Sequence, residues 1–395
     1  MIRELLSKQN IDFMERAREV AERHVRPIAA QHDVDQTYPW TFQKAIQDAG
    51  LSGVWIPKDY GGSGGTVLDL CLVVEQISRA CGGMGVAYAV NALGSFPILL
   101  GGSEEQKARW LPGIAAGEKL IAFGLSEKDA GSDAGSMVTK AEKDGDHYIV
   151  NGSKTWNTMG HWADWIFCLV RTDSKAKPQE GISFLLIDMK TPGITVKPII
   201  MADGGHEVNE VFFDNVKVPI ANLVGKENEG WTCAKFLLAN ERLGIAAVPQ
   251  SKRGVAALKD IARAEQEDGK PLIENQTFAE KIADLEIQVT ALEFTELRVL
   301  SSMAHGGQPG PEVSGLKVRG SEIQQRITEL TMEAVGEYAA PYLPGLLWQG
   351  SNEEPVGPAY AHQVAPRYFN TRKTTIYGGS NEIQKGIISK MVLGL

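Results

Sequence analysis

The stretch that decides the fold is His147-Tyr148-Ile149-Val150-Asn151-Gly152-Ser153-Lys154-Thr155-Trp156-Asn157-Thr158, which begins with a run of β-forming residues. Further short β-rich runs follow at 165–170 and 182–187, and residues 208–218 alternate apolar and polar side chains. Turn residues separate these runs, and we interpret Asn151-Gly152 as one such turn. The pattern predicts a compact β-barrel or sandwich of about a hundred residues.

Helical spacing flanks this β-rich zone on both sides. Apolar residues recur three and four positions apart from about residue 10 to residue 115, as at Phe13, Ala17 and Val20. The helical pattern returns after residue 230, most clearly over 278–303 and 313–335. Helices, then strands, then helices indicate an α+β protein with an inserted β-domain. We expect an N-terminal α-helical domain at 1–118, a middle β-barrel or sandwich domain at 119–226 and a C-terminal helical bundle at 227–395.

Several segments between these patterns are predicted to be loops. The glycine-rich turn at 61–65 lies between helices and does not follow a buried strand, so we do not interpret it as a phosphate-binding loop. Pro249 indicates a break in the helical pattern. Residues 306–311 are predicted to be a loop, and the Pro- and Gly-rich stretch 340–358 a long ordered loop.

The composition argues against several classes of protein. A chain of 395 residues exceeds the ~250 residues at which a single core stops growing. A formal net charge of −9 argues against nucleic-acid binding, which needs a basic patch. We find no run of about 18 apolar residues and no secretory signal, so we expect a cytoplasmic protein with no membrane segment. The cysteines lack metal-site spacing, so we expect no metal and reduced core thiols at Cys71, Cys81, Cys168 and Cys233.

Three segments carry residue types suited to ligand binding. Trp156 and Thr158 share a face on a strand, where they can stack on a planar ring and bond its edge, although a Trp packed in the β-core is the ordinary alternative. The hydroxyl-rich segment 125–133 can bind an anion or a carbonyl, or it is a solvated turn. Residues 374–384 place two glycines before a helix N-terminus that Ser380 or Asn381 can cap.

With these segments together, the chain resembles the acyl-CoA dehydrogenase family over essentially its full length. Four matches occur in the family's order, and they are Leu125-Ser126-Glu127…Ala130-Gly131-Ser132-Asp133, Asn151 to Trp156, Glu241-Arg242, and Ile376 to Gln384. Within the family the chain looks most like the branch that includes the large subunit of pimeloyl-CoA dehydrogenase. The resemblance implies a flavoprotein oxidoreductase of fatty acid metabolism and β-oxidation, which converts an acyl-CoA to the trans-2-enoyl-CoA with FAD and passes electrons to an electron-transfer flavoprotein.

The resemblance also implies roles for particular residues. Phe123, Leu125 and Ser126 would meet the isoalloxazine ring of FAD, and Trp156 and Thr158 would cover its other side. The remaining contacts would be Ser132, Arg242 and Tyr377 to the substrate and Ser380 and Glu382 to the phosphate and adenosine end of FAD. The backbone N–H of Gly378 would bind the thioester oxygen.

The catalytic base is expected in a different place from many family members. Those members supply a Glu directly after the Tyr of the Ile-Tyr motif, where this chain has Gly378. Others place the Glu directly before an Arg on the first long helix of the C-terminal domain, which corresponds here to Glu241-Arg242. Apolar residues surround Glu241, and burial would raise the pKa of its carboxyl toward the working range. A surface carboxylate is the alternative for Glu241, and the resemblance favours the catalytic role.

Two departures from the family concern the FAD contacts that a second subunit usually supplies. The Arg and Phe expected before Gly269-Lys270-Pro271 are absent, and residues 334–338 replace the usual Gly-Gly-x-Gly-Tyr run. Three explanations of these departures stay open. They are a homodimer or homotetramer with altered contacts, a heterotetramer with a related subunit, and poor retention of FAD. An acyl-CoA oxidase or flavin monooxygenase is the alternative activity. Dicarboxylyl, branched, aromatic and steroid side-chain CoA esters all stay open as substrates.

Overall fold

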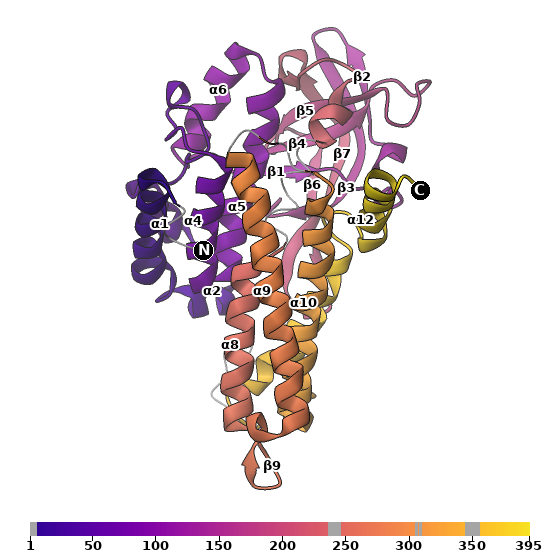
Figure 1. The fold of residues 1–395 in the computed structure, drawn as a ribbon. Coiled ribbons are helices and arrows are strands. Elements are labelled where there is room, and N and C mark those ends of the chain that lie inside the picture. Colours follow the sequence, from indigo (N-terminus) through magenta and orange to yellow (C-terminus); the bar gives the residue numbers. More distant parts are fainter. Residues whose placement is uncertain (1–5, 236–245, 305–306, 308–309, 344–355) are drawn as a thin grey trace.

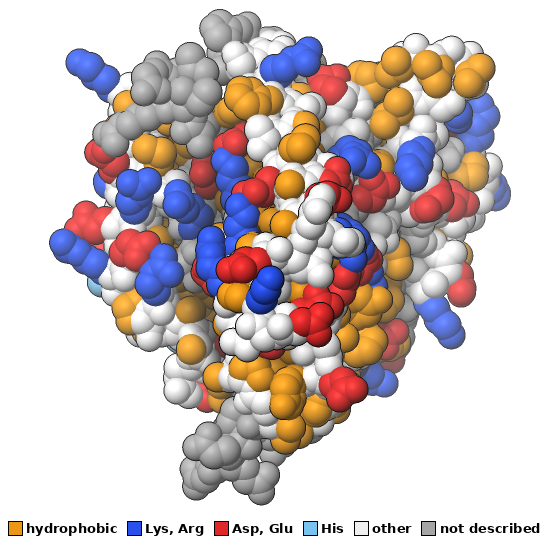
Figure 2. Space-filling view, turned by 60° about the horizontal axis from the view of Figure 1, so that its bottom comes forward, with side chains coloured by type: hydrophobic (Ala, Val, Ile, Leu, Met, Phe, Trp, Pro, Cys, Tyr) orange, Lys and Arg blue, Asp and Glu red, His pale blue; other side chains and the backbone are white. Residues whose placement is uncertain are grey.

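The structure, a computed structural model, describes residues 6–235, 246–304, 307, 310–343 and 356–395. Figure 1 shows a group of N-terminal helices beside a strand-rich part, and a long bundle of C-terminal helices that extends below both to the β9–β10 hairpin. The surface seen from the hairpin end carries basic and acidic side chains interspersed with apolar ones (Figure 2). The helical, β and helical parts therefore follow one another as the sequence predicts.

Capping residues set where several N-terminal helices begin. Ser7, Thr66 and Ser103 each accept a hydrogen bond from the backbone N–H three residues on, and the side chain of that residue bonds back to the cap. The elements that they and their neighbours form are α1 (Lys8–Val20), η2 (Ala21–Val25), α2 (Ala29–Asp35), α3 (Trp40–Asp48), α4 (Val67–Ala80), α5 (Gly82–Gly101) and α6 (Glu104–Ala115).

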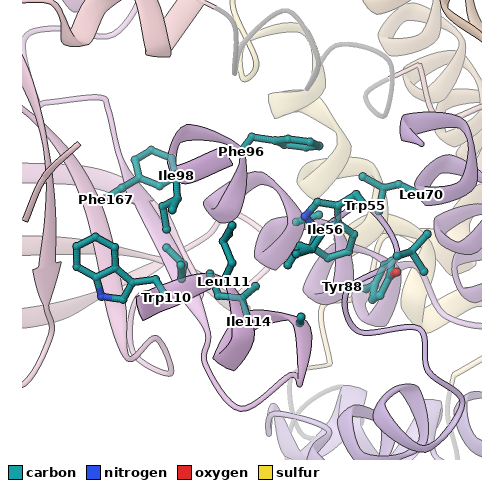
Figure 3. Packing of buried hydrophobic residues seen from close by; sticks show 14 of the residues in the cluster. Trp55, Ile56, Leu70, Tyr88, Phe96, Ile98, Trp110, Leu111, Ile114 and Phe167 are labelled. Carbon is teal, nitrogen blue, oxygen red and sulfur yellow. The ribbon is translucent and has the colours of Figure 1, made fainter. Parts of the chain in front are cut away.

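The largest hydrophobic core joins these helices to the strands. Trp55 and Tyr88 pack edge to face inside it, with ring centroids 5.8 Å apart. Phe167 and Phe184 extend the same cluster into the β-part, as Figure 3 shows for Phe167 beside Ile98. The N-terminal helices and the strands therefore share one core across the expected boundary at residue 118.

Helix α5 runs through this core. By length and composition it is apolar enough to cross a membrane, although polar residues interrupt its sequence. Of its most apolar window, 67% is buried inside the protein, and residues such as Met84, Asn91 and Ile98 pack against other elements. The burial accounts for its apolar composition, because a central core helix needs apolar side chains on most of its faces.

The strands form a mixed sheet in the order β6-β7-β3-β2-β4-β5-β8, with β1 parallel to β4. Strands β2 and β4 pair only at Lys140 and Arg171. A second apolar core contains residues from strands on both sides of this junction, such as Val150 and Leu185. The strand bounds are β1 (Ile121–Gly124), β2 (Lys140–Asp144), β3 (His147–Thr158), β4 (Trp165–Arg171), β5 (Ile182–Asp188), β6 (Ile194–Ile200), β7 (His206–Pro219) and β8 (Leu223–Val224).

The prediction that Asn151-Gly152 ends a strand is wrong. Strand β3 continues through these residues, and its pairing with β7 takes up a bulge between Val150 and Gly152. Gly152 has a φ of +143°, and a Cβ placed there would lie 2.6 Å from Thr139 Oγ1. The glycine therefore serves a close approach between strands rather than a reversal of the chain.

The C-terminal helices bury the stripe expected from their spacing. Ile282, Leu285, Val289 and Leu292 lie in the core between helices α8, α9 and α10. Pro249 lies in the first turn of α8. Half of the predicted loop at 306–311 and most of the predicted loop at 340–358 lie outside the described residues. The element bounds are α8 (Val248–Ala264), β9 (Gln266–Glu267), β10 (Lys270–Pro271), α9 (Gln276–Ala304), α10 (Glu312–Val335), α11 (Val364–Thr371) and α12 (Asn381–Ile388).

The cysteines carry free thiols. Cys168 is fully buried, and the other three are partly buried. Burial raises the pKa of Cys71 to about 12 and that of Cys168 to about 11, so both thiols stay protonated at neutral pH. In the described ranges no group of His, Cys, Asp or Glu side chains has the arrangement of a metal site.

Candidate functional site

The end of β1 is tied to β3 by hydrogen bonds. Asn157 Nδ2 donates to the carbonyl of Phe123 over 2.7 Å, and the backbone N–H of Thr155 donates to the carbonyl of Ser126 over 2.9 Å. Leu125 is buried between them, whereas the side chains of Phe123 and Ser126 remain partly exposed. The two segments that the sequence singles out around residues 125 and 156 therefore lie side by side.

A second bulge in β3 turns Trp156 out of the β-core. The pairing with β7 shifts register between Lys154 and Asn157, and Trp156 adopts a φ of +63°, which is rare for a residue other than glycine. The Trp156 side chain is 54% exposed, while Thr155 and Asn157 on either side are buried. Trp156 is therefore not a core residue, and it leaves an aromatic surface open beside the partly exposed Thr158.

A buried ion pair fixes β3 next to this bulge. Lys154 Nζ lies 2.8 Å from Glu127 Oε1, and the two side chains are 0% and 6% exposed. The Glu127 carboxylate also accepts hydrogen bonds from the backbone N–H groups of Val138 and Thr139, at 2.7 and 3.0 Å. Burial acts to raise the pKa of Glu127, but Lys154 and these hydrogen bonds outweigh it and hold the pKa below its usual value. The pair fixes the loop after Ser126 against β3.

The Tyr377-Gly378 segment forms a tight loop before α12. The carbonyl of Lys373 accepts a hydrogen bond from the backbone N–H of Tyr377 over 3.1 Å. Gly378 and Gly379 follow with φ values of +63° and +81°, and Ser380 then caps α12. Within the described part of the chain, no group accepts a hydrogen bond from the Gly378 N–H. The loop thus presents a backbone donor at a position that lacks a side chain.

Helix α12 is anchored on α10 through its first residue. Asn381 Oδ1 accepts hydrogen bonds from Lys317 Nζ over 2.8 Å and from Ser321 Oγ over 3.2 Å, and all three side chains are buried. On the opposite side Glu382 is exposed, and hydrogen bonds from its own N–H and from Ser380 lower the pKa of its carboxyl. The start of α12 is thus held firmly, with polar groups facing outward.

Two buried amide side chains near these segments lack the partners that they need. Gln384 in α12 is fully buried, and among the described residues neither its Nε2 nor its Oε1 has a hydrogen-bond partner. Its Nε2 would lie 2.4 Å from a Cβ at Gly379. Asn157 Oδ1 also lacks a partner in the described ranges. Each such group costs roughly 1–3 kcal/mol unless a ligand or water satisfies it.

A polar bridge brings the end of β3 and the Tyr377 loop together. The carbonyl of Glu207 accepts a hydrogen bond from the backbone N–H of Met159 over 3.3 Å, directly after Thr158. The Glu207 carboxylate forms an ion pair with Lys373, whose carbonyl in turn holds Tyr377. The structure therefore links the open aromatic surface of β3 to the glycine loop through two residues.

The other predicted site residues are less constrained by the structure. Ser132 is exposed in the loop between β1 and β2. Glu241 and Arg242 lie outside the described residues. Sequence inspection missed the supporting roles of Glu127, Lys154, Glu207, Lys373 and Gln384. Lys154 stands between Ser153 and Thr155 in the sequence, so no hydrophobic pattern indicated its burial.

The structure thus places a β-part between two helical parts, with the aromatic side chain of Trp156 exposed beside β3 and a buried amide at Gln384 that has no partner among the described residues. The chain matches the models of the acyl-CoA dehydrogenase N-terminal domain over residues 7–118, the middle domain over 122–216 and the C-terminal domain over 228–393. The chain belongs to the acyl-CoA dehydrogenase family.

Relatives and solved structures agree with this assignment. An acyl-CoA dehydrogenase of Bacillus subtilis (strain 168) is 31% identical, over 98% of this chain and 99% of the relative. The crystal structure of an acyl-CoA dehydrogenase from Geobacillus kaustophilus is similar with a TM-score of 0.86 and 28% identity, and 99% of each chain is covered. A chain from the structural work on the electron transferring flavoprotein of Acidaminococcus fermentans has a TM-score of 0.85 and 27% identity, over 98% of each chain.

Members of this family are FAD-binding flavoproteins, and they are oxidoreductases of fatty acid metabolism that act on CH–CH bonds. The residues present fit this cofactor. Trp156 offers an open aromatic face for the isoalloxazine ring, and the N-terminus of α12, with Ser380 and the unpartnered Gln384, offers donors for phosphate and adenosine groups.

Proposed function

We propose that this chain removes one hydrogen from the α-carbon and one from the β-carbon of an acyl-CoA thioester, giving the trans-2-enoyl-CoA. The observation that carries the proposal is Gly378, which lacks a side chain and presents a backbone N–H with no acceptor among the described residues. This loop can donate a hydrogen bond to the thioester oxygen, but it cannot supply a carboxylate. The base must therefore come from another part of the chain.

We infer that Glu241 is that base. It lies outside the described residues, but the chain resumes at Ala246, five residues later, next to Gly320 of α10. Residue 321, the neighbour of Gly320, bonds to Asn381 at the start of α12. The described chain after Glu241 thus resumes beside Gly320, the neighbour in sequence of the α10 residue that bonds to the start of α12, and this proximity supports the proposal.

The reaction divides between these groups. The Glu241 carboxylate takes the α-proton, the C–H electron pair forms the α,β double bond, and a hydride leaves the β-carbon. FAD supplies the acceptor for that hydride. The Gly378 N–H stabilises the negative charge that develops on the thioester oxygen. We assign the flavin ring to Phe123, Leu125, Ser126, Trp156 and Thr158, the adenosine end of FAD to Ser380 and Glu382, and further substrate contacts to Ser132, Arg242 and Tyr377.

The substitution Glu241→Gln tests the base. It removes the proton acceptor but keeps the size of the side chain, so we expect FAD content to be unchanged and anaerobic flavin bleaching by substrate to slow by about a thousandfold or more. Glu229→Gln, at an exposed residue that follows β8, is the matched control and should bleach at the wild-type rate. If Glu241→Gln bleached as fast as the control, the base would lie elsewhere.

We propose that the electrons leave to an electron-transfer flavoprotein in the cytoplasm. The likeness to the chain from the Acidaminococcus fermentans work supports this choice, because that work concerns such a carrier. An oxidase on the same scaffold would instead reduce oxygen. Measuring turnover with an electron-transfer flavoprotein, and oxygen consumption without one, separates the two activities. Dependence on the carrier is the expected outcome, and rapid oxygen consumption with acyl-CoA alone would establish the oxidase.

We further propose that this chain works as an oligomer, either alone or with a related subunit. The sequence is altered at 264–271 and 334–338, where family members contact the FAD of the neighbouring subunit, so the subunit that completes the FAD site stays open. Flavin content per chain in protein expressed alone distinguishes these assemblies. One FAD per chain would rule out an obligatory partner, and recovery of FAD only on co-expression would establish one. Flavin bleaching against a panel of dicarboxylyl, branched, aromatic and steroid CoA esters defines the acyl group.

A further inference from the structure

A cleft of about 520 Å³ lies between the N-terminal helices and the C-terminal bundle, and none of its lining residues is among those assigned to the flavin or the thioester. It is formed by α1 and η2, by the last turns of α4 and by the first turns of α8. Its volume falls in the range of about 300–1,000 Å³ that small-molecule sites occupy. Its lining residues are Arg18, Glu22, Arg26, Glu75, Gln76, Arg79, Pro249, Lys252, Arg253 and Ala256.

The charge of the cleft is opposite to that of the whole chain. Five of the lining side chains are basic and two are carboxylates, whereas the chain carries a formal net charge of −9. Figure 2, which views the molecule from the hairpin end, shows Lys and Arg side chains gathered on the left and centre of that face, with acidic ones among them. A concave surface lined by one sign of charge attracts ligands of the opposite sign.

The hydrogen bonds of these basic residues show which of them remain able to hold an anion. Arg26 is engaged with Glu22 through two bonds of 2.7 and 2.8 Å, and Lys252 pairs with a carboxylate of α9. Arg18, in contrast, bonds to the neutral amide of Gln76, and Arg253 bonds to backbone carbonyls at the end of α4. At least two guanidinium groups therefore have neutral groups as hydrogen-bond partners.

Arg253 lines the cleft from α8. It is only partly exposed, and burial lowers the pKa of its guanidinium, with Arg26 acting in the same direction. A bound anion would offset both effects, because it compensates the cost of removing a cation from water and of holding two cations close together. Arg18 and Arg79 are exposed and carry flexible side chains that can close over such an anion.

We propose that this cleft binds a small molecule through a phosphate or diphosphate group. Three guanidinium groups, from Arg18, Arg79 and Arg253, reach it from three different helices. A phosphate has enough oxygens and charge to accept hydrogen bonds from several guanidinium forks at once, whereas a single carboxylate is matched to one fork. The ligand joins the N-terminal helices to the first turns of α8, so its binding stabilises the contact between the two helical domains.

Titration of the FAD-loaded enzyme with inorganic pyrophosphate, followed by calorimetry, tests this site. We expect saturable binding to one site per chain that weakens as salt is added. Arg79→Gln and Arg18→Gln should each weaken binding by at least about tenfold, because each removes a charge-assisted hydrogen bond to the phosphate. Both residues are exposed, so neither change should unfold the protein. Arg23→Gln, an exposed residue of η2 outside the cleft, is the matched control and should bind as the wild type does.

Two further measurements test the chemistry of the ligand and the location of its site. Succinate at the same concentration should bind at least tenfold more weakly, and equal binding would overturn the choice of phosphate over carboxylate. Excess CoA tests whether the pyrophosphate occupies the substrate site. Full displacement by CoA, with wild-type affinity in Arg79→Gln and Arg18→Gln, would overturn the proposal. Absence of any pyrophosphate binding at millimolar concentration would overturn it as well.

Discussion

At the scale of single residues, the buried pair of Lys154 and Glu127 controls the loop beside the proposed flavin site. Its partners are 2.8 Å apart and almost completely removed from water. Such a pair is tolerated because the Glu127 carboxylate receives two further backbone hydrogen bonds. Its role is therefore to position Ser126 and β3 relative to each other, and removing one partner leaves the other charge buried without its counter-ion.

Lys154→Met should destabilise the protein by about 3 kcal/mol, because it leaves the Glu127 carboxylate buried and unpaired. The midpoint of urea unfolding measures this change, and FAD content should fall with it. The double variant Glu127→Gln/Lys154→Met removes both charges and should recover much of the lost stability. A double variant no more stable than Lys154→Met would show that the charge of Glu127 is not the cause.

At the scale of helices, close contacts rather than sequence patterns determine how the C-terminal bundle packs. Gly320 of α10 faces the backbone of Ala246, two residues before α8 begins, and a Cβ on Gly320 would lie 2.4 Å from the Ala246 carbonyl oxygen. Gly315, one and a half turns earlier in α10, has open space around the same position. The two glycines look alike in sequence, but only one of them is required by the packing.

Gly320→Ala should therefore lower the melting temperature, because the added methyl group forces α8 away from α10. Gly315→Ala should raise stability by up to about 1 kcal/mol, since alanine favours the helix and meets no neighbour. Thermal unfolding of both variants checks the pair. Shifts of the melting temperature in the same direction for both substitutions would rule out a steric cause.

At the same scale, the pKa of Glu296 is raised where α9 approaches α4. Burial, together with the nearby Glu75 and Glu293, raises the pKa of Glu296 to about 8. Because the folded protein favours the protonated acid, the stabilising effect is present below the usual pKa of about 4.5 and is lost as the pH rises through about 8.

Glu296→Gln should therefore unfold at a higher temperature than the wild type at pH 8 and at a similar temperature near pH 4. Melting curves over this pH range provide the measurement. Glu280→Gln, on the exposed side of the same helix, is the control and should follow the wild type throughout. Parallel curves for wild type and Glu296→Gln would show that Glu296 titrates normally.

At the scale of the whole molecule, the proposed site depends on contacts between parts that are far apart in the sequence. The Glu207–Lys373 pair connects the end of β3 to the glycine loop before α12. The shared core around Phe167 connects the strands to the N-terminal helices. We propose domain limits at 1–118, 119–226 and 227–395, with these contacts holding the three domains together around the flavin.

Lys373→Met should impair catalysis more than folding, because the Glu207–Lys373 pair is partly exposed and such pairs contribute only about 0–1 kcal/mol to stability. We expect weaker FAD binding and slower flavin bleaching with a nearly unchanged melting temperature. The reversed pair Glu207→Lys/Lys373→Glu should restore part of the lost affinity for FAD. An inactive Lys373→Met variant whose affinity for FAD equals that of the wild type would argue against a positioning role.

The sequence by itself determined the order of helical and β-rich parts, the buried stripe of α9 and the family. It also determined that residue 378, a glycine, has no side chain to act as a base. These features are local in the chain, since they depend on spacing, turn residues and short motifs. Only the tertiary structure decided that Asn151-Gly152 is a bulge, that Trp156 is turned outward, and that Lys154 and Glu207 have acidic or basic partners far away in sequence. The basic cleft was also decided only by the tertiary structure, because its arginines come from three helices and meet only when the domains pack together.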